Sequence, residues 1–231
     1  MHLIEDNVII MIARDLIVDS IPMVKTSDTG NDALAWMEMH RLSHLPIVNN
    51  EEFLGLVSDT DIYDNNCQDD PLGNHNLSLV RPFVFHNQHI FEVVDIVARL
   101  RLTIIPVLDQ NKHYIGAISL FRLVTEFAKM ISVEKAGGII ILESNIHDYS
   151  LSEISQIVET NNAKILILFV SSTDDSTMIS ITIKVDITDL SSIVQTFERY
   201  DYKIKASFLS EDMLKAFYQD RYDSFLNYLN I

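Results

Sequence analysis

The segment HLPIVNNEEFLGLVSDTD, residues 44–61, contains two short apolar runs on either side of a polar turn. The runs are Leu45–Val48 and Leu54–Val57, and the turn between them is Asn49–Glu52. Two apolar runs joined in this way predict a β-hairpin. Hydroxyl and carboxylate side chains follow at once in the sequence SDTD, residues 58–61, which is typical of a helix start.

A segment of the same kind recurs as IPVLDQNKHYIGAISLFRL, residues 105–123. Pro46 and Pro106 are 60 positions apart, whereas Gly55 and Gly116 are 61 apart, so the second copy has one extra turn residue. The upstream helices agree as well, because the apolar positions 33, 34 and 37 precede Val93, Val94 and Val97 by 60. An internal repeat of this length is the strongest feature of the sequence.

The pattern Leu-Pro-Ile-Val, polar turn, Gly-Leu-Val-Ser-x-x-Asp resembles the CBS repeat, a nucleotide-sensing module that works in tandem pairs. The resemblance covers roughly residues 8–130 in two copies. It implies that Asp61 accepts hydrogen bonds from the ribose of a ligand, and that Ser58 contacts the ribose or the α-phosphate. It also places Ile21, Pro22 and Leu56 near the base. A second interpretation also holds for this pair, since Ser and Asp favour helix N-termini.

The second copy departs from this pattern at Ser119-Leu-Phe-Arg122, where arginine stands in the position of the carboxylate. Arginine cannot accept a hydrogen bond, so ribose recognition of the usual kind fails there. Arg122 is expected either to pair with a phosphate, including that of a ligand seated in the first repeat, or to leave the second site empty as a solvated or dimer-contact side chain.

The elements expected up to residue 133 follow the two repeats. The polar segment 65–76 is expected to link them. The expected elements besides the hairpins are helix Asn7–Leu16, strand Ile21–Lys25, a helix from Asp28 or Thr29 to Arg41, a short helix from Thr60, strand Phe83–Phe85, helix Ile90–Leu100 and helix Leu120–Ile131.

Gly137-Gly138 marks a second boundary, after which the element order becomes β-α-β-β-α-β, the ferredoxin-like arrangement. After a CBS pair this order looks like an ACT domain, and the whole layout is similar to the acetoin-utilisation type of CBS–ACT protein. The expected fold class is α+β, with domains at 1–68, 74–133 and 137–231. The expected elements are strand Ile139–Glu143, a helix opened by a Ser150–Glu153 capping box, strands Lys164–Ser172 and Met178–Asp186, helix Leu190–Tyr200, strand Tyr202–Phe208 and an amphipathic C-terminal helix Glu211–Leu229.

In ACT domains the loop after the first strand often lines an amino-acid site. Here that loop is Glu143–Tyr149, and it lacks the usual glycine, although Asn145 and Asp148 could contact an amine. The alternative is a domain that serves dimerisation through its open sheet edge. The C-terminal helix is expected to pack on its own domain or on a dimer partner, through the stripe Leu214, Phe217 or Tyr218, Tyr222, Phe225 and Leu229.

Composition limits the partners of this 231-residue chain. The formal net charge of −16 repels nucleic acid and anionic membranes, and no apolar run reaches the ~20 residues of a membrane span. The single cysteine, Cys67, and the absence of a signal peptide fit a cytoplasmic protein. His40 and His44 share metal-ligand spacing but are expected to serve packing. Phosphate-loop, HExxH and nucleophile-elbow motifs are absent.

The sequence therefore predicts a non-catalytic regulatory protein that dimerises and binds an adenosine-containing ligand such as AMP, ADP or ATP, with no catalytic cofactor and no metal. Two alternatives stay open. One is an interaction scaffold whose CBS sites are vestigial and which binds a partner protein. The other is an enzyme with a cleft of convergent titratable groups, which the sequence does not reveal.

Overall fold

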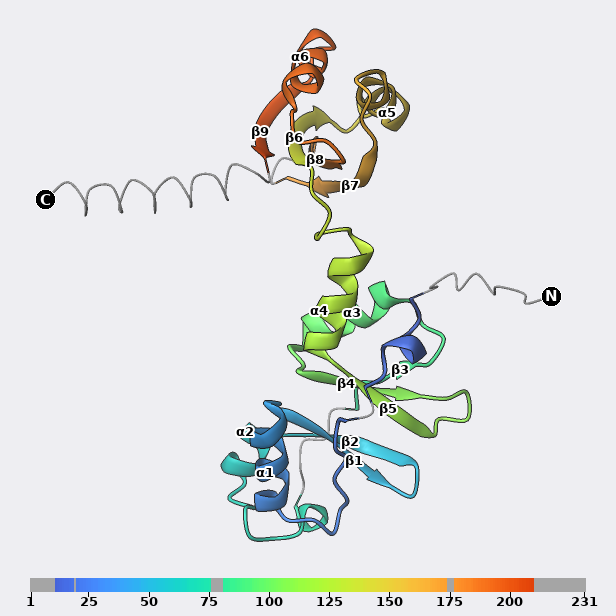
Figure 1. Cartoon of the computed structure of the whole chain (residues 1–231). Coiled ribbons are helices and arrows are strands. Elements are labelled where there is room, and N and C mark those ends of the chain that lie inside the picture. Colours follow the sequence, from blue (N-terminus) through green and yellow to red (C-terminus); the bar gives the residue numbers. More distant parts are fainter. Residues whose placement is uncertain (1–10, 19, 76–80, 174–176, 210–231) are drawn as a thin grey trace, which may run out of the picture. The chain divides into compact units, whose positions relative to one another are not determined.

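The computed structural model describes residues 11–18, 20–75, 81–173 and 177–209. The chain forms two compact units, which meet between Phe127 and Ala128. Figure 1 shows their elements along the chain.

The first repeat of unit 1 contains the expected hairpin and helix. Its elements are the 3-10 helix η1 (Ala13–Leu16), α1 (Gly30–His40), β1 (His44–Asn49), β2 (Glu52–Ser58) and α2 (Asp59–Asp64). Thr29 caps α1 as predicted, because its side chain accepts from the amide of Asp32 while the Asp32 carboxylate accepts from the Thr29 amide.

The hairpin turn is tight because of two residues with positive φ. Asn50 has φ 48° and Glu51 has φ 74°, the left-handed pair that matches the twist of the flanking strands. β1 and β2 are antiparallel, with Leu45 opposite Val57, and the register shifts between Ile47 and Val48.

Two expectations for the N-terminal segment need correction. The strand predicted at Ile21–Lys25 is reduced to one parallel bridge between Val24 and Ile47. Only Val24 bonds on both sides, donating to Pro46 at 3.0 Å and accepting from Val48 at 2.8 Å. The helix predicted at Asn7–Leu16 is a single 3-10 turn in its described part, and its beginning lies outside the described residues.

The 3-10 helix η2 (Leu72–Asn74) follows the first repeat, and its Leu72 is buried in the core of that repeat. The second repeat has the same succession of helix, hairpin and helix, preceded by a short strand. Its elements are β3 (Val84–Phe85), α3 (Ile90–Leu100), β4 (Ile104–Leu108), β5 (Tyr114–Ser119) and α4 (Leu120–Met130). β3 is parallel to β4, and β4 is antiparallel to β5 with Ile105 opposite Ile118. The helix and strand predictions are confirmed here to within a few residues at their ends.

Unit 2 has one antiparallel sheet in the order β7-β8-β6-β9. Its elements are β6 (Gly138–Asn145), α5 (Leu151–Thr160), β7 (Ile165–Ser172), β8 (Met178–Val185), α6 (Ser191–Arg199) and β9 (Lys203–Leu209), so the predicted β-α-β-β-α-β succession is present. Both helices bury their apolar residues against one face of the sheet, around Ile140, Ile181 and Phe197.

The capping box predicted at Ser150 is only half formed. The Ser150 hydroxyl accepts from the Glu153 amide at 3.3 Å, whereas the Glu153 carboxylate accepts from the Tyr202 hydroxyl at 2.6 Å. Burial and this carboxylate raise the pKa of Tyr202. The predicted C-terminal helix Glu211–Leu229 lies outside the described residues.

Candidate functional site

Ser58 and Asp61 form a complete capping box at the start of α2. The Ser58 hydroxyl accepts from the Asp61 amide at 3.0 Å. One carboxylate oxygen of Asp61, Oδ2, accepts from the Ser58 amide at 2.9 Å and from the Ser58 hydroxyl at 2.7 Å. Oδ2 is therefore occupied by the bonds of the helix cap, and both residues are only partly exposed. A ribose would therefore have to bond the other carboxylate oxygen, Oδ1, or displace the cap.

Ser119 takes the equivalent place at the start of α4. Its hydroxyl accepts from the Arg122 amide at 3.1 Å, which satisfies one of the free donors of the first turn. The Arg122 guanidinium lies 3.0 Å from the carboxylate of Glu126, one turn further on, and Glu126 is buried. The arginine Nε is itself buried and has no hydrogen-bond partner among the described residues.

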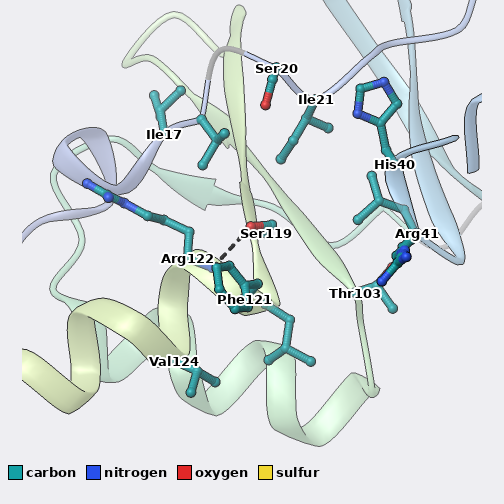
Figure 2. A pocket seen from close by; sticks show the side chains of 13 residues that line it. Ile17, Ser20, Ile21, His40, Arg41, Thr103, Ser119, Phe121, Arg122 and Val124 are labelled. Carbon is teal, nitrogen blue, oxygen red and sulfur yellow. Dashed lines mark hydrogen bonds between the residues drawn. The ribbon is translucent and has the colours of Figure 1, made fainter.

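A cavity of about 970 Å³ opens at this helix start. That volume is near the upper end of the range of small-molecule pockets, about 300–1,000 Å³. Figure 2 shows the segment between η1 and α1, the end of α1 and the start of α4 around it. The lining residues are Ile17, Val18, Ser20, Ile21, His40, Arg41, Leu42, Thr103, Ser119, Leu120, Phe121, Arg122 and Val124.

The lining combines apolar walls with positive charge. Its charged members, Arg41 and Arg122, are both basic, and no carboxylate lines it among the described residues. α4 also presents its N-terminal turn here, and that turn contains no acidic residue. The partial positive charge of a helix N-terminus adds to that of the guanidinium groups. The cavity is therefore suited to a ligand with an anionic part and an apolar part.

The structure brings together only some of the residues that the sequence nominated. Ile21, Ser119 and Arg122 line the cavity, whereas Pro22, Leu56, Ser58 and Asp61 do not. Leu56 is 4% exposed and forms part of the core.

Sequence reasoning missed the contribution of the end of α1. His40 was expected to serve packing only, and Arg41 had no expected role, yet both line the cavity. Arg41 adopts the left-handed conformation, φ 54°, that ends the helix. No local signal in the sequence pairs this helix end with Ser119, because the two come together only in the tertiary fold.

His44 links the two repeats through Thr103. Its Nδ1 lies 3.1 Å from the hydroxyl of Thr103, which also accepts from the Ser43 amide at 3.1 Å. Burial lowers the pKa of His44, against the opposing effect of nearby aspartates. In the described part of the chain, no three His, Cys, Asp or Glu side chains gather as a metal site would require.

Unit 2 has a smaller, polar cavity of about 380 Å³ beside the loop after β6. Asn145 and Asp148 line it, as do Glu143, Glu153 and Lys203. Lys203 and Lys205 lower the pKa of Glu143 by hydrogen bonds and charge. Two of the acids that line this cavity therefore already have partners. Glu143 pairs with the two lysines, and Glu153 accepts a hydrogen bond from the Tyr202 hydroxyl.

The helices within the described ranges include none with the length and hydropathy of a membrane span.

Comparison with known proteins identifies the first repeat. Residues 13–65 match the family model of the CBS domain. Similar solved structures include a CBS domain pair/ACT domain protein from Thermotoga maritima, at 22% identity over 52% of this chain and 98% of that one, with a TM-score of 0.47. A Vibrio cholerae structure described as a putative acetoin utilization protein, AcuB, is 20% identical over 54% and 96%, with a TM-score of 0.47. CBSX2 in complex with AMP is 17% identical over 51% and 96%, with a TM-score of 0.45. The chain thus contains a CBS domain at residues 13–65, the segment that carries the hairpin and the Ser58–Asp61 pair.

Proposed function

We propose that this protein is a non-catalytic regulatory protein that binds an adenosine-containing nucleotide in its CBS module. The observation that carries the proposal is the cavity of about 970 Å³ at the start of α4, with apolar walls and two arginines. A nucleotide needs both, because its base is largely apolar on its faces and its phosphates are anionic. In a chain of net charge −16, a lining whose charged members are both basic supports an anionic ligand.

The phosphates would bind where α4 begins. A helix N-terminus with its unpaired amides favours phosphate, and an arginine offers several donors in a planar fork. Arg122 has five N–H donors in all, more than the single carboxylate of Glu126 requires. The base would pack against the apolar wall, to which Ile17 and Ile21 contribute.

Asp61 and Ser58 would supply a second, separate site in the first repeat, with Asp61 accepting from ribose hydroxyls through Oδ1. Oδ2 is held by the helix cap. The two sites differ in the sign of their charge, so binding at each should depend on a different part of the ligand. Binding at Arg122 should depend on the phosphates, and binding at Asp61 on the ribose.

The domain organisation completes the proposal. Residues 1–68 and 74–133 would be two CBS repeats, and 137–231 an ACT-like domain of ferredoxin type, with the whole chain a cytoplasmic homodimer. The antiparallel order β7-β8-β6-β9 supports the ferredoxin comparison. Ligand binding would change the balance between two arrangements of the protein, which requires different affinities for the two.

The test is thermal unfolding of the full chain with adenosine, AMP, ADP and ATP. A ligand at 100 times its Kd adds about 2.7 kcal/mol, or roughly 5–10 °C for a unit of this size. In the double variant Arg122→Gln, Glu126→Gln, the affinity for the nucleotide should fall about 10- to 150-fold, the loss of a charged hydrogen bond of about 1.5–3 kcal/mol. Changing both residues removes the ion pair as a whole, so the buried carboxylate of Glu126 is not left charged in the absence of Arg122.

Arg99→Gln is the matched control, because Arg99 also forms an i,i+4 ion pair but its side chain is 66% exposed and lies outside the cavity. Its nucleotide affinity should equal that of the wild type. If none of the four compounds shifts the unfolding temperature, the sensor proposal fails. The scaffold alternative then gains support from the carboxylate committed to the cap at Asp61 and the arginine at position 122.

A further inference from the structure

The sheet of unit 2 has one face that lies away from the core formed with α5 and α6. α5 and α6 cover the opposite face, where the buried residues include Ile140, Leu142 and Ile183. The side chains of alternate residues point to the two faces of a sheet. The neighbours of these core residues along each strand therefore form the open face.

The strand register arranges this face in rows across all four strands, in the order β7-β8-β6-β9. The first row is Ile167, Lys184, Ile139 and Phe208, and the second is Phe169, Thr182, Ile141 and Ala206. Six of these eight side chains are apolar. Phe169 is 43% exposed and Phe208 is 54% exposed, so two aromatic rings at the two edge strands are left facing solvent.

Polar contacts bound this apolar patch at both ends. In the first row, the Lys184 ammonium donates to the carbonyls of Ser132 and Val133, at 2.6 and 3.0 Å. Beyond the second row, Glu143 forms ion pairs with Lys203 and Lys205. The open apolar surface therefore has definite limits and the width of the sheet.

We propose that the C-terminal segment of this chain, residues 211–229, packs on this face through its apolar stripe. The segment lies outside the described residues, and its sequence predicts an amphipathic helix with Leu214, Tyr218 and Tyr222 on one side. β9 ends at Leu209, directly after Phe208 of the first row, so only one residue of sequence separates β9 from the segment.

The dimensions fit this arrangement. A helix of 19 residues would be about 28 Å long at ~1.5 Å per residue. Four strands span about 14 Å between the outer two, at ~4.8 Å between neighbours. About ten residues suffice to cross from β9 to β7, which brings the stripe from Leu214 to Tyr222 over the apolar rows.

A segment joined directly to the sheet has an advantage over a second molecule. Its effective concentration at the face is set by a short connection and reaches the millimolar range, well above that of a second copy in dilute solution. The segment also carries four acids against two bases, Lys215 and Arg221, which suits a face bordered by the lysines of β9.

The experiment places a tryptophan on the face of the full chain. Trp36 is the single native tryptophan, so Phe169→Trp is introduced together with Trp36→Phe. Its fluorescence should be that of a covered indole, at every protein concentration. In the stripe variant Tyr218→Ser, Tyr222→Ser, the emission should shift to longer wavelength. Asp220→Ser, which lies off the stripe, should leave it unchanged.

Val170→Trp in the Trp36→Phe background is the reporter control, because Val170 has nearly the same exposure, 46%, and points to the other side of β7. Its emission should not respond to the stripe variant. An exposed emission from Phe169→Trp in the unaltered C-terminal sequence would overturn the proposal. So would a covered emission that depends on protein concentration and survives the stripe variant, because a second copy would then cover the face. If the double stripe variant fails to fold, the emission is measured in Tyr218→Ser and in Tyr222→Ser separately.

Discussion

Replacing Asp61 by alanine should lower the stability of unit 1 as well as any ribose binding. The carboxylate accepts two hydrogen bonds from Ser58, at 2.9 and 2.7 Å, and it lies in the first turn of α2. Loss of an N-terminal cap costs about 0.5–2 kcal/mol, and loss of a negative charge at a helix N-terminus costs about 0.3–1 kcal/mol. The Ser58 hydroxyl can still accept from the amide of residue 61, so half of the box remains.

The expected total is about 1–2 kcal/mol, which corresponds to roughly 3–10 °C in the unfolding temperature of a unit of this size. Thermal unfolding without ligand, followed by circular dichroism, measures it. Asp61→Asn keeps an acceptor oxygen and loses only the charge, so it should lie between the wild type and Asp61→Ala.

Asp64→Ala is the control, because Asp64 is an exposed acid at the other end of the same short helix. A negative charge is unfavourable at that end, so its removal should be neutral or slightly stabilising. Equal unfolding temperatures for wild type and Asp61→Ala, within 1 °C or so of each other on the scale of these effects, would refute the cap argument. Ligand binding by Asp61→Ala must be compared at a temperature where both proteins are folded.

Three further changes test other parts of the fold. Gly30→Ala should destabilise the first repeat by about 1–3 kcal/mol, because the added Cβ would lie 2.5 Å from the carbonyl oxygen of Cys67; an unchanged midpoint in urea would contradict this. Lys184→Met keeps the apolar stem but loses both carbonyl contacts, so unit 2 should lose about 1–3 kcal/mol, whereas Lys164→Met, whose side chain is 69% exposed, should change little. The pKa of Glu143 is lowered in the folded state, so its contribution is fully present above its unfolded value near 4.5 and is lost as the pH falls below it. Glu143→Gln should therefore flatten the decline in unfolding temperature below pH 4.5, and an identical decline in both proteins would contradict the ion cluster.

The sequence predicted the secondary structure well where it depends on periodicity, caps and turns within a short segment. The hairpin of the first repeat, the Thr29 cap and the helix Ile90–Leu100 were all expected from periodicity and turn chemistry, and all are present. The strand expected at Ile21–Lys25 is missing because a strand needs a partner over several residues. Within residues 21–25, the backbone pairs with β1 only at Val24.

Tertiary effects explain the other differences. Glu153 was expected to complete a capping box, and a capping motif alone cannot reveal that Tyr202, 49 positions away, competes for the same carboxylate. The cavity is likewise a tertiary feature that no local sequence motif reveals. Ile21, Arg41 and Arg122 each have an ordinary local role, and only the packing of the two repeats places them around one space.

The two repeats show how one architecture can present opposite charges at equivalent positions. Ser58 and Ser119 cap their helices alike, each accepting from the amide three residues on. Three residues after the serine, the first repeat has Asp61 and the second has Arg122. The carboxylate turns back to bond its own cap, whereas the guanidinium reaches forward to Glu126. An acid at the first helix start already satisfies its N-terminal charge, so an added phosphate would meet repulsion there. The first turn of α4 contains no acidic residue, so a bound phosphate would supply the negative charge that a helix N-terminus favours. For this reason we expect the anionic end of a ligand at α4, and unchanged nucleotide binding by the double variant Arg122→Gln, Glu126→Gln would contradict it.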